Sequence, residues 1–366
     1  MIVNDKNIPS RPAPASTRGI AGWLRENLFS TPGNSVLTFM GLAFLVWAIP
    51  PIFQWAVLQA DFIGVNKEAC TSEGACWVFV SARFQQFMYG FYPDTELWRV
   101  NIFFAQMTAV LVWVLWDKMP RRTWGGVWFL TGFPLTSFIL LHGGFLGLET
   151  VETHKWGGLM LTLVLSLVGM VIALPIGILL ALGRRSDMPA VSSFCTVFIE
   201  IWRGVPLITI LFMASVMLPL FIPGDIELDK LARAMIGISL FEAALIAEVI
   251  RGGLQAMPKG QYEAADAMGL SYWQGMRLII MPQVLKISIP GIVNTFVQLF
   301  KDTSLVLIIG LFDLLAVMQA GITDVNWPNI SIEAFVFTGF VFWAFCFGMS
   351  RYSVALERKL DTGHKS

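Results

Sequence analysis

The residues whose types and spacing could do chemistry lie mostly in one segment, residues 251–286, which reads RGGLQAMPKGQYEAADAMGLSYWQGMRLIIMPQVLK. Good helix formers precede Gly269, which can end a helix in a left-handed conformation. Ser271 and Gln274 have the spacing of a capping box, which predicts that a second helix starts there and ends at Pro282. The segment therefore predicts two short helices joined at a glycine corner.

The side chains of this corner suit contact with another protein. Alanines small enough to allow a close approach are Ala264, Ala265 and Ala267. Bulky side chains that could fill a partner's pocket are Tyr262, Met268, Tyr272 and Trp273. Composition alone also fits an ordinary surface helical hairpin, and a docking element is the alternative.

A second group of chemistry-bearing residues interrupts long apolar stretches. Its members are Glu242, Lys301, Asp302, Thr303 and Ser304. Lys301 and Asp302 lie about 100° apart on a helix, so they do not pair on one face. Ionisable side chains inside a membrane usually face a bundle interior or a cavity. This group therefore either lines a polar pathway or locks helices or subunits together, and we slightly favour locking for residues 301–304.

Two further carboxylates stand three residues before an arginine. Glu200 precedes Arg203 and Glu248 precedes Arg251, each near the end of an apolar stretch. This spacing places both members of a pair on one helical face. We predict interfacial ion pairs that fix helix ends, rather than ligands for a substrate.

The composition requires a membrane to position these residues. The chain has 366 residues, of which 56% are hydrophobic and 14% charged, and its mean hydropathy is +0.67. Soluble proteins average about a quarter charged residues. A soluble globule, a disordered chain and a disulfide-rich small domain are excluded, and the zero net charge gives no basic excess for nucleic acid.

Stretches long enough to cross a bilayer predict eight transmembrane helices. They are residues 27–60, 100–116, 123–148, 156–183, 204–224, 234–250, 287–312 and 334–350. The prolines at 50 and 51 predict that the first helix ends near Phe53. Most lysines and arginines between the stretches fall on the side shared by both termini and residues 251–286, which the positive-inside rule assigns to the cytoplasm.

Cys70 and Cys76 share the predicted external loop, near residues 59–99. If the membrane is a bacterial inner membrane, this position is oxidising, so the two cysteines could form a local disulfide. Two free thiols on a mobile loop are the equal alternative. Neither arrangement bears on the residues of the cytoplasmic corner.

The cytoplasmic loop also carries a spaced signature, made of Glu263, Ala264, Ala265, Gly269, Ile279 and Pro282. It resembles the EAA signature of ABC importer permeases, EAA-x3-G-x9-I-x-L-P, with Met281 in place of leucine. Segments similar to those of polar amino-acid permeases, the histidine/glutamine/arginine type, are 200–206, 248–253 and 301–305. The resemblance covers residues 157–360, and the extra N-terminal stretches are similar to those of the general L-amino-acid (Aap/Bzt-type) permeases.

The resemblance implies an all-α polytopic membrane protein, with a type I ABC importer permease core and three added N-terminal helices. The expected parts are a cytoplasmic segment 1–34, a three-helix extension 35–150, a five-helix core 151–360 and a cytoplasmic tail 361–366. It also implies that an ATPase docks on the corner. The coupling residues would be Tyr262, Glu263, Ala264, Ala265, Gly269, Ile279 and Pro282.

The chain has no G-x-x-x-x-G-K-[ST] phosphate-binding loop, so we expect no bound cofactor or metal and no enzyme activity of its own. ATP and Mg would bind a separate ABC ATPase homodimer. Other expected partners are a sister permease, a periplasmic amino-acid-binding protein, membrane lipid and the polar amino-acid substrate. The expected location is the bacterial inner membrane. An ion-coupled secondary transporter using Glu242 or Asp302, and a scaffolding half without its own substrate site, are the alternatives.

Overall fold

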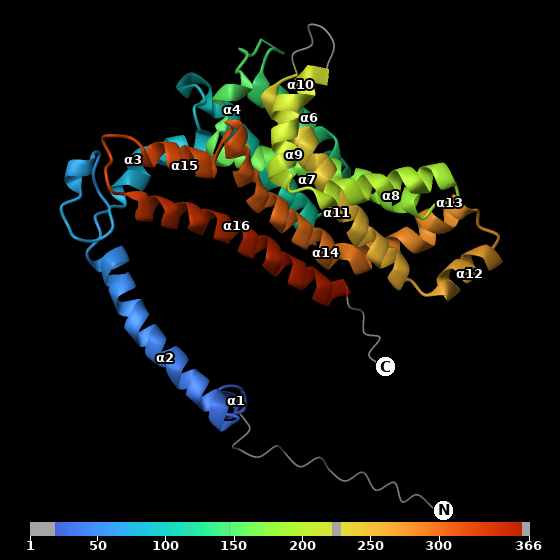
Figure 1. Ribbon diagram of the computed structural model, residues 1–366, viewed down its shortest axis with the longest axis horizontal. Coiled ribbons are helices and arrows are strands. Elements are labelled where there is room, and N and C mark those ends of the chain that lie inside the picture. Colours follow the sequence, from blue (N-terminus) through green and yellow to red (C-terminus); the bar gives the residue numbers. More distant parts are fainter. Residues whose placement is uncertain (1–18, 117, 146, 222–227, 361–366) are drawn as a thin grey trace, which may run out of the picture. The chain divides into compact units, whose positions relative to one another are not determined.

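A computed structural model describes residues 19–116, 118–145, 147–221 and 228–360 (Figure 1). The predicted tail 361–366 and the first 18 residues of the predicted cytoplasmic segment lie outside the described residues. The chain divides into two compact units, Met1–Val78 and Phe79–Ser366. Each unit is treated separately below.

The first unit contains α1 (Gly19–Asn27), α2 (Pro32–Phe53), a π turn η2 (Gln54–Leu58) and a short 3-10 turn η3 (Lys67–Ala69). Thr31 caps α2 by accepting the N–H of Asn34, and Pro32 occupies its first turn, where a proline needs no donor. The two prolines at 50 and 51 lie inside the helix, and helical structure continues past Phe53 through the π turn to Leu58, so the prediction that the helix ends near Phe53 is wrong. All of its residues are at least partly exposed, which fits a helix that faces lipid.

The second unit begins with helices of the N-terminal extension. They are α3 (Val78–Tyr89), η4 (Asp94–Glu96), α4 (Leu97–Leu115), α5 (Arg122–Leu130), α6 (Gly132–His142) and η5 (Thr153–Lys155). The remaining elements are α7 (Gly158–Arg184), α8 (Pro189–Gly204), α9 (Leu207–Phe212), η6 (Met213–Met217), α10 (Leu218–Phe221), α11 (Lys230–Ala256), α12 (Lys259–Ala267), α13 (Tyr272–Gly275), η7 (Met276–Ile280), α14 (Met281–Asp302), η8 (Thr303–Ile309), β1 (Phe312–Asp313), α15 (Leu314–Ile322) and α16 (Ser331–Leu360).

The centre of the second unit is α7, which packs against α8, α11 and α14, while α16 lies along α14 (Figure 1). Small residues let these helices approach closely. A side chain at Gly177 would come within 2.7 Å of the Cγ2 of Ile246 on α11. The helices are therefore held by dense packing, which is what drives association in a membrane.

Within the described residues, five helices are long and apolar enough to cross a membrane, or seven if two bent pairs each count as one. All eight predicted stretches coincide with helices or bent pairs. The predicted stretch that is not counted among these seven is 234–250, which lies in α11, a helix of 27 residues. It fails the composition test because Glu242 and Glu248 lie in it and Arg233 and Arg251 border its apolar stretch. The prediction of about eight spans therefore exceeds the five to seven that composition supports.

The span predicted over residues 204–224 begins at a sharp bend, and its helical run starts at Leu207. α8 and the helical run that starts with α9 meet at an angle of 102°. Val205 is extended, with φ −107° and ψ 135°, as expected for a residue before a proline. Pro206, which has no N–H, then starts the new helical direction. Residues 222–224 lie outside the described residues.

Helix α3 was predicted as external loop, yet it packs on the core. Phe79 contacts Trp327 at a ring separation of 5.4 Å, and Arg83 forms an ion pair with Asp324. Gly90, with φ +68°, lies so close to Gly157 that a side chain there would be 2.3 Å from the Gly157 Cα. These contacts attach the extension to the end of the core opposite α12.

Candidate functional site

The helical corner forms from its local sequence signals. Gly269 has φ +70° and its N–H bonds to the carbonyl of Asp266. The Ser271 N–H bonds to the Gln274 side chain at 2.9 Å, and both halves of the predicted capping box are present. The chain therefore reverses between α12 and α13 over a few residues, and the corner lies at the edge of the second unit (Figure 1).

The prediction that the second helix ends at Pro282 is wrong. Helical structure continues from Tyr272 to Ile309 without interruption. The π turn η7 precedes α14, and Pro282 lies in the first turn of α14. A π turn shifts the hydrogen-bonding register, so the missing N–H of a proline at this position removes little helical bonding. The corner is consequently continuous with a membrane helix.

One face of α12 is fastened to the membrane helices. The Tyr262 hydroxyl accepts a hydrogen bond from Arg185 at 2.6 Å, and the Arg185 guanidinium lies 4.7 Å from the Tyr262 ring centroid. Gln261 accepts a hydrogen bond from Gln283 of α14 at 3.0 Å. Ala265 is buried against Gly275. Arg185 and Gln283 thus connect α12 to the ends of α7 and α14.

The opposite face is open. Glu263 and Ala264 are exposed, and Met268 and Trp273 expose 75% and 67% of their surface. Tyr262 is half-buried and Ala265 is buried, so both side chains contact their own protein, and contact of either residue with a partner stays a prediction. Ile279 packs at the edge of the core, and Pro282 is exposed.

Arginines from three helices surround Glu248. Its carboxylate lies 2.6 Å from Arg184, 2.6 Å from Arg251 and 3.4 Å from Arg203. Glu200 pairs with Arg184 at 3.0 Å rather than with Arg203, which corrects the predicted pairing. The reason is tertiary: the end of α7 brings Arg184 between α8 and α11. The cluster fastens three helices at one end of the bundle.

Glu242 is fully buried, and neither of its carboxylate oxygens has a hydrogen-bond partner among the described residues. The neighbouring acid on α14 is Asp302, which is half-buried. Burying an unpaired charge is costly, so a carboxyl in these surroundings is favoured in its neutral form.

The other polar residues of this region lie on α14 and η8. The Thr303 hydroxyl donates to the Phe300 carbonyl and the Ser304 hydroxyl to the Lys301 carbonyl, each at 2.8 Å. Lys301 is exposed and borders a cavity of about 300 Å³ together with Ser304 and Thr338. The structure thus separates the group into a buried acid, Glu242, and a cavity-facing cation, Lys301.

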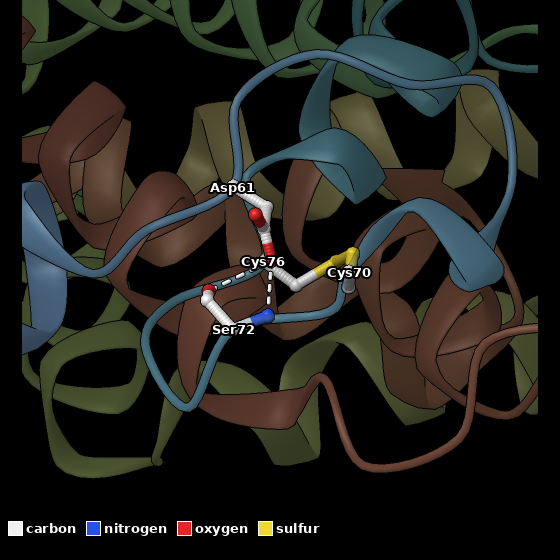
Figure 2. Close-up of a disulfide and its surroundings, with 4 residues drawn as sticks. All are labelled: Asp61, Cys70, Ser72 and Cys76. Carbon is white, nitrogen blue, oxygen red and sulfur yellow. Dashed lines mark hydrogen bonds between the residues drawn. A yellow bond between two sulfur atoms is a disulfide. The ribbon is translucent and has the colours of Figure 1, made fainter.

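In the first unit, Cys70 and Cys76 are joined by a disulfide (Figure 2). The Asp61 carboxylate accepts hydrogen bonds from the Ser72 N–H at 2.9 Å and the Ser72 hydroxyl at 2.7 Å. These bonds hold the pKa of Asp61 below its ordinary value. The disulfide and the carboxylate together close a small loop.

Sequence reasoning missed three arginines. Arg184 and Arg185 were treated only as cytoplasmic charge, and Arg99 as a charge at the edge of a predicted span. Arg99 is 1% exposed, lies 2.7 Å from Glu96 and donates to the Glu149 carbonyl at 2.7 Å. Its i, i+3 spacing from Glu96 was the available signal.

Comparisons with known proteins identify the family of this chain. Residues 173–362 match the family described as binding-protein-dependent transport system inner membrane component. The chain is 51% identical to the inner membrane amino-acid ABC transporter permease protein YhdY of Escherichia coli (strain K12), over 97% of each chain. It is 40% identical to the glutamate/glutamine/aspartate/asparagine transport system permease protein BztC of Rhodobacter capsulatus, over 99% of each chain. A crystal structure of an amino acid ABC transporter with histidines covers 55% of this chain and 92% of its own, at 26% identity and a TM-score of 0.49. The chain therefore belongs to the family of inner-membrane permease components of binding-protein-dependent transport systems.

Proposed function

We propose that this chain is the membrane-spanning subunit of an ATP-driven importer of polar amino acids, with glutamate, glutamine, aspartate and asparagine as its substrates. The names of its relatives support the substrate class. The observation that carries the mechanism is the α12–α13 corner, which is fastened on one face and open on the other. ATP and Mg bind the partner ATPase, and this chain has no catalytic step of its own.

The contacts of α12 describe how force reaches the membrane. A partner ATPase that holds Met268 and Trp273 moves α12 as a rigid piece. Arg185 passes the motion to α7, Gln283 passes it to α14, and the arginine cluster around Glu248 links α7 to α8 and α11. Rigid-body rocking of packed helices is a common way to alternate access across a membrane.

The remaining partners and the orientation follow from this role. The corner and both termini lie in the cytoplasm, a periplasmic binding protein delivers the amino acid to the opposite face, and a sister permease completes the pathway. Glu242 and Lys301 are our candidates for contact with the substrate, because one is buried without a partner and the other faces a cavity.

The test is uptake of radiolabelled glutamate and glutamine by proteoliposomes that contain this chain with its ATPase, receptor and sister permease. The variant replaces Met268 and Trp273 by alanine. We expect uptake to fall about tenfold or more and the ATPase to be lost from the purified complex, since truncating large central contact residues has effects of this size. Val325→Ala, at a side chain that is 90% exposed on the opposite face, is the control.

Two results would contradict the proposal. One is normal ATPase copurification and uptake by the double variant. The other is uptake that continues without enclosed ATP and collapses with an uncoupler, which would establish ion-coupled transport instead.

A further inference from the structure

A cavity of about 470 Å³ lies behind the coupling corner. It is enclosed by the end of α7, the end of α11 and the start of α12. Four of its lining residues are cationic: Arg184, Arg185, Arg251 and Lys259. The other lining residues are uncharged, so the wall of the cavity is basic.

The acids near this cavity do not neutralise it. Arg184 and Arg251 share Glu248, which also serves Arg203. Arg185 donates hydrogen bonds to the Tyr262 hydroxyl and the Leu254 carbonyl, at 2.6 and 3.4 Å, and neither acceptor carries a negative charge. Glu200 compensates part of the charge of Arg184. Positive charge therefore exceeds negative charge around an accessible volume.

The position of the cavity indicates the ligand. Arg184 and Arg185 lie where a 27-residue membrane helix ends, at the level of lipid headgroups. The exposed Met268 and Trp273 lie on the open face of the corner, whereas the cavity lies between α12 and the membrane helices. Guanidinium groups match phosphate oxygens in pairs, and basic pockets between helices on the cytoplasmic side bind anionic headgroups.

We propose that this cavity binds the phosphate group of an anionic membrane lipid and that the bound phosphate ties α12 to α7. The inference rests on the proposed function for the cytoplasmic placement of α12. Arg185, at the end of α7, already stacks on the ring of Tyr262 in α12. A phosphate held by Arg185 and by Lys259, the first residue of α12, therefore links α7 to α12 a second time. The lipid composition of the inner leaflet then sets how firmly the motor is coupled to the pathway.

The experiment measures lipid retention rather than transport, so its failure is distinguishable from failure of the proposed function. The complex with its ATPase is reconstituted in nanodiscs of phosphatidylcholine with or without phosphatidylglycerol, extracted, and analysed by native mass spectrometry. Lys259→Gln and Arg185→Gln are the pocket variants. Arg277→Gln removes one exposed charge from the same cytoplasmic segment outside the cavity and is the matched control.

We expect the wild type and Arg277→Gln to retain phosphatidylglycerol in preference to phosphatidylcholine. Lys259→Gln should weaken retention about fivefold, the effect of one cation at an anionic surface, and Arg185→Gln at least as much. A second arm adds inorganic phosphate or pyrophosphate. Competition at millimolar concentration without lipid would identify a free phosphate as the source of the same group.

Three results would overturn the proposal. Equal retention by the pocket variants and Arg277→Gln would show that the cavity is not the site. Equal retention of both lipids would show that charge is not recognised. Retention by the isolated chain that disappears when the ATPase binds would show that acidic side chains of the ATPase fill the cavity.

Discussion

Replacing Glu248 by glutamine tests whether the arginine cluster holds the bundle together. The substitution keeps the shape of the side chain and removes the charge that three arginines share. Glu248 exposes 15% of its side chain, whereas Arg184, Arg251 and Arg203 expose 22%, 36% and 37%. The pair with Arg184 is the most enclosed and should dominate the energetic effect.

The magnitude follows from these exposures. A hydrogen bond to a charged group contributes about 1.5–3 kcal/mol, and exposed ion pairs contribute about 0–1 kcal/mol. We assign the larger value to Arg184 and the smaller value to the other two, so the free energy of unfolding should fall by about 2–4 kcal/mol. At roughly 2–4 °C per kcal/mol, the value for domains of about 150–250 residues, the apparent Tm should fall by roughly 4–16 °C.

Fluorescence-detected size-exclusion chromatography after heating measures this Tm in detergent. Glu200→Gln is the matched control, because the Glu200 side chain is 57% exposed and also pairs with Arg184. Its expected loss is under about 1 kcal/mol. Equal Tm values for the two variants, or no coupling energy between Glu248 and Arg184 in a double-mutant cycle, would refute the reasoning.

Three further predictions concern other parts of the chain. Gly177→Leu should destabilise the bundle by about 1–3 kcal/mol through overpacking against α11, and Gly252→Leu, where nothing lies within 4 Å, should leave the Tm nearly unchanged. The pKa of Asp61 is lowered from its ordinary value of 3.8, so its hydrogen bonds to Ser72 stabilise the disulfide loop fully at a pH above 3.8. This stabilisation is lost as the pH falls through the lower pKa of the folded state. Hydrogen exchange at pH 5 and pH 3 should therefore show loosening at the lower pH, and Asp61→Asn should remove this dependence. Glu242→Gln should alter substrate affinity or selectivity in the uptake assay with normal assembly of the complex, and unchanged kinetics across acidic, neutral and basic amino acids would contradict it.

The parts of the site that sequence predicted depend on local interactions. The capping box at Ser271 and the left-handed Gly269 involve neighbours in the chain, so residue types alone indicated the corner. The start of α2 is local in the same way, because Thr31 caps it and Pro32 occupies its first turn. Long apolar stretches likewise predicted the five helices of the described residues that are long and apolar enough to cross a membrane, since length and composition decide this property.

The parts that sequence missed depend on contacts between distant segments. Glu200 pairs with Arg184 because three helices converge, and no spacing along the chain encodes that convergence. The hydrogen bond from Arg185 to the Tyr262 hydroxyl could not be predicted, because the two residues are 77 positions apart in the chain. Helix α3 was missed because its residues are too polar and too few for a membrane span, although their aromatic side chains pack on the core.

The attachment of α3 has a consequence for engineering this chain. Phe79, Arg83 and Gly90 reach the outer rim of the core through an aromatic contact, an ion pair and a backbone approach. A shortened protein that starts at residue 157 would lack these neighbours. The Trp327 ring would then be exposed, and the Asp324 carboxylate would lose its ion pair with Arg83. We therefore expect a chain shortened to the core to need substitutions at Trp327 and Asp324 that replace the lost contacts.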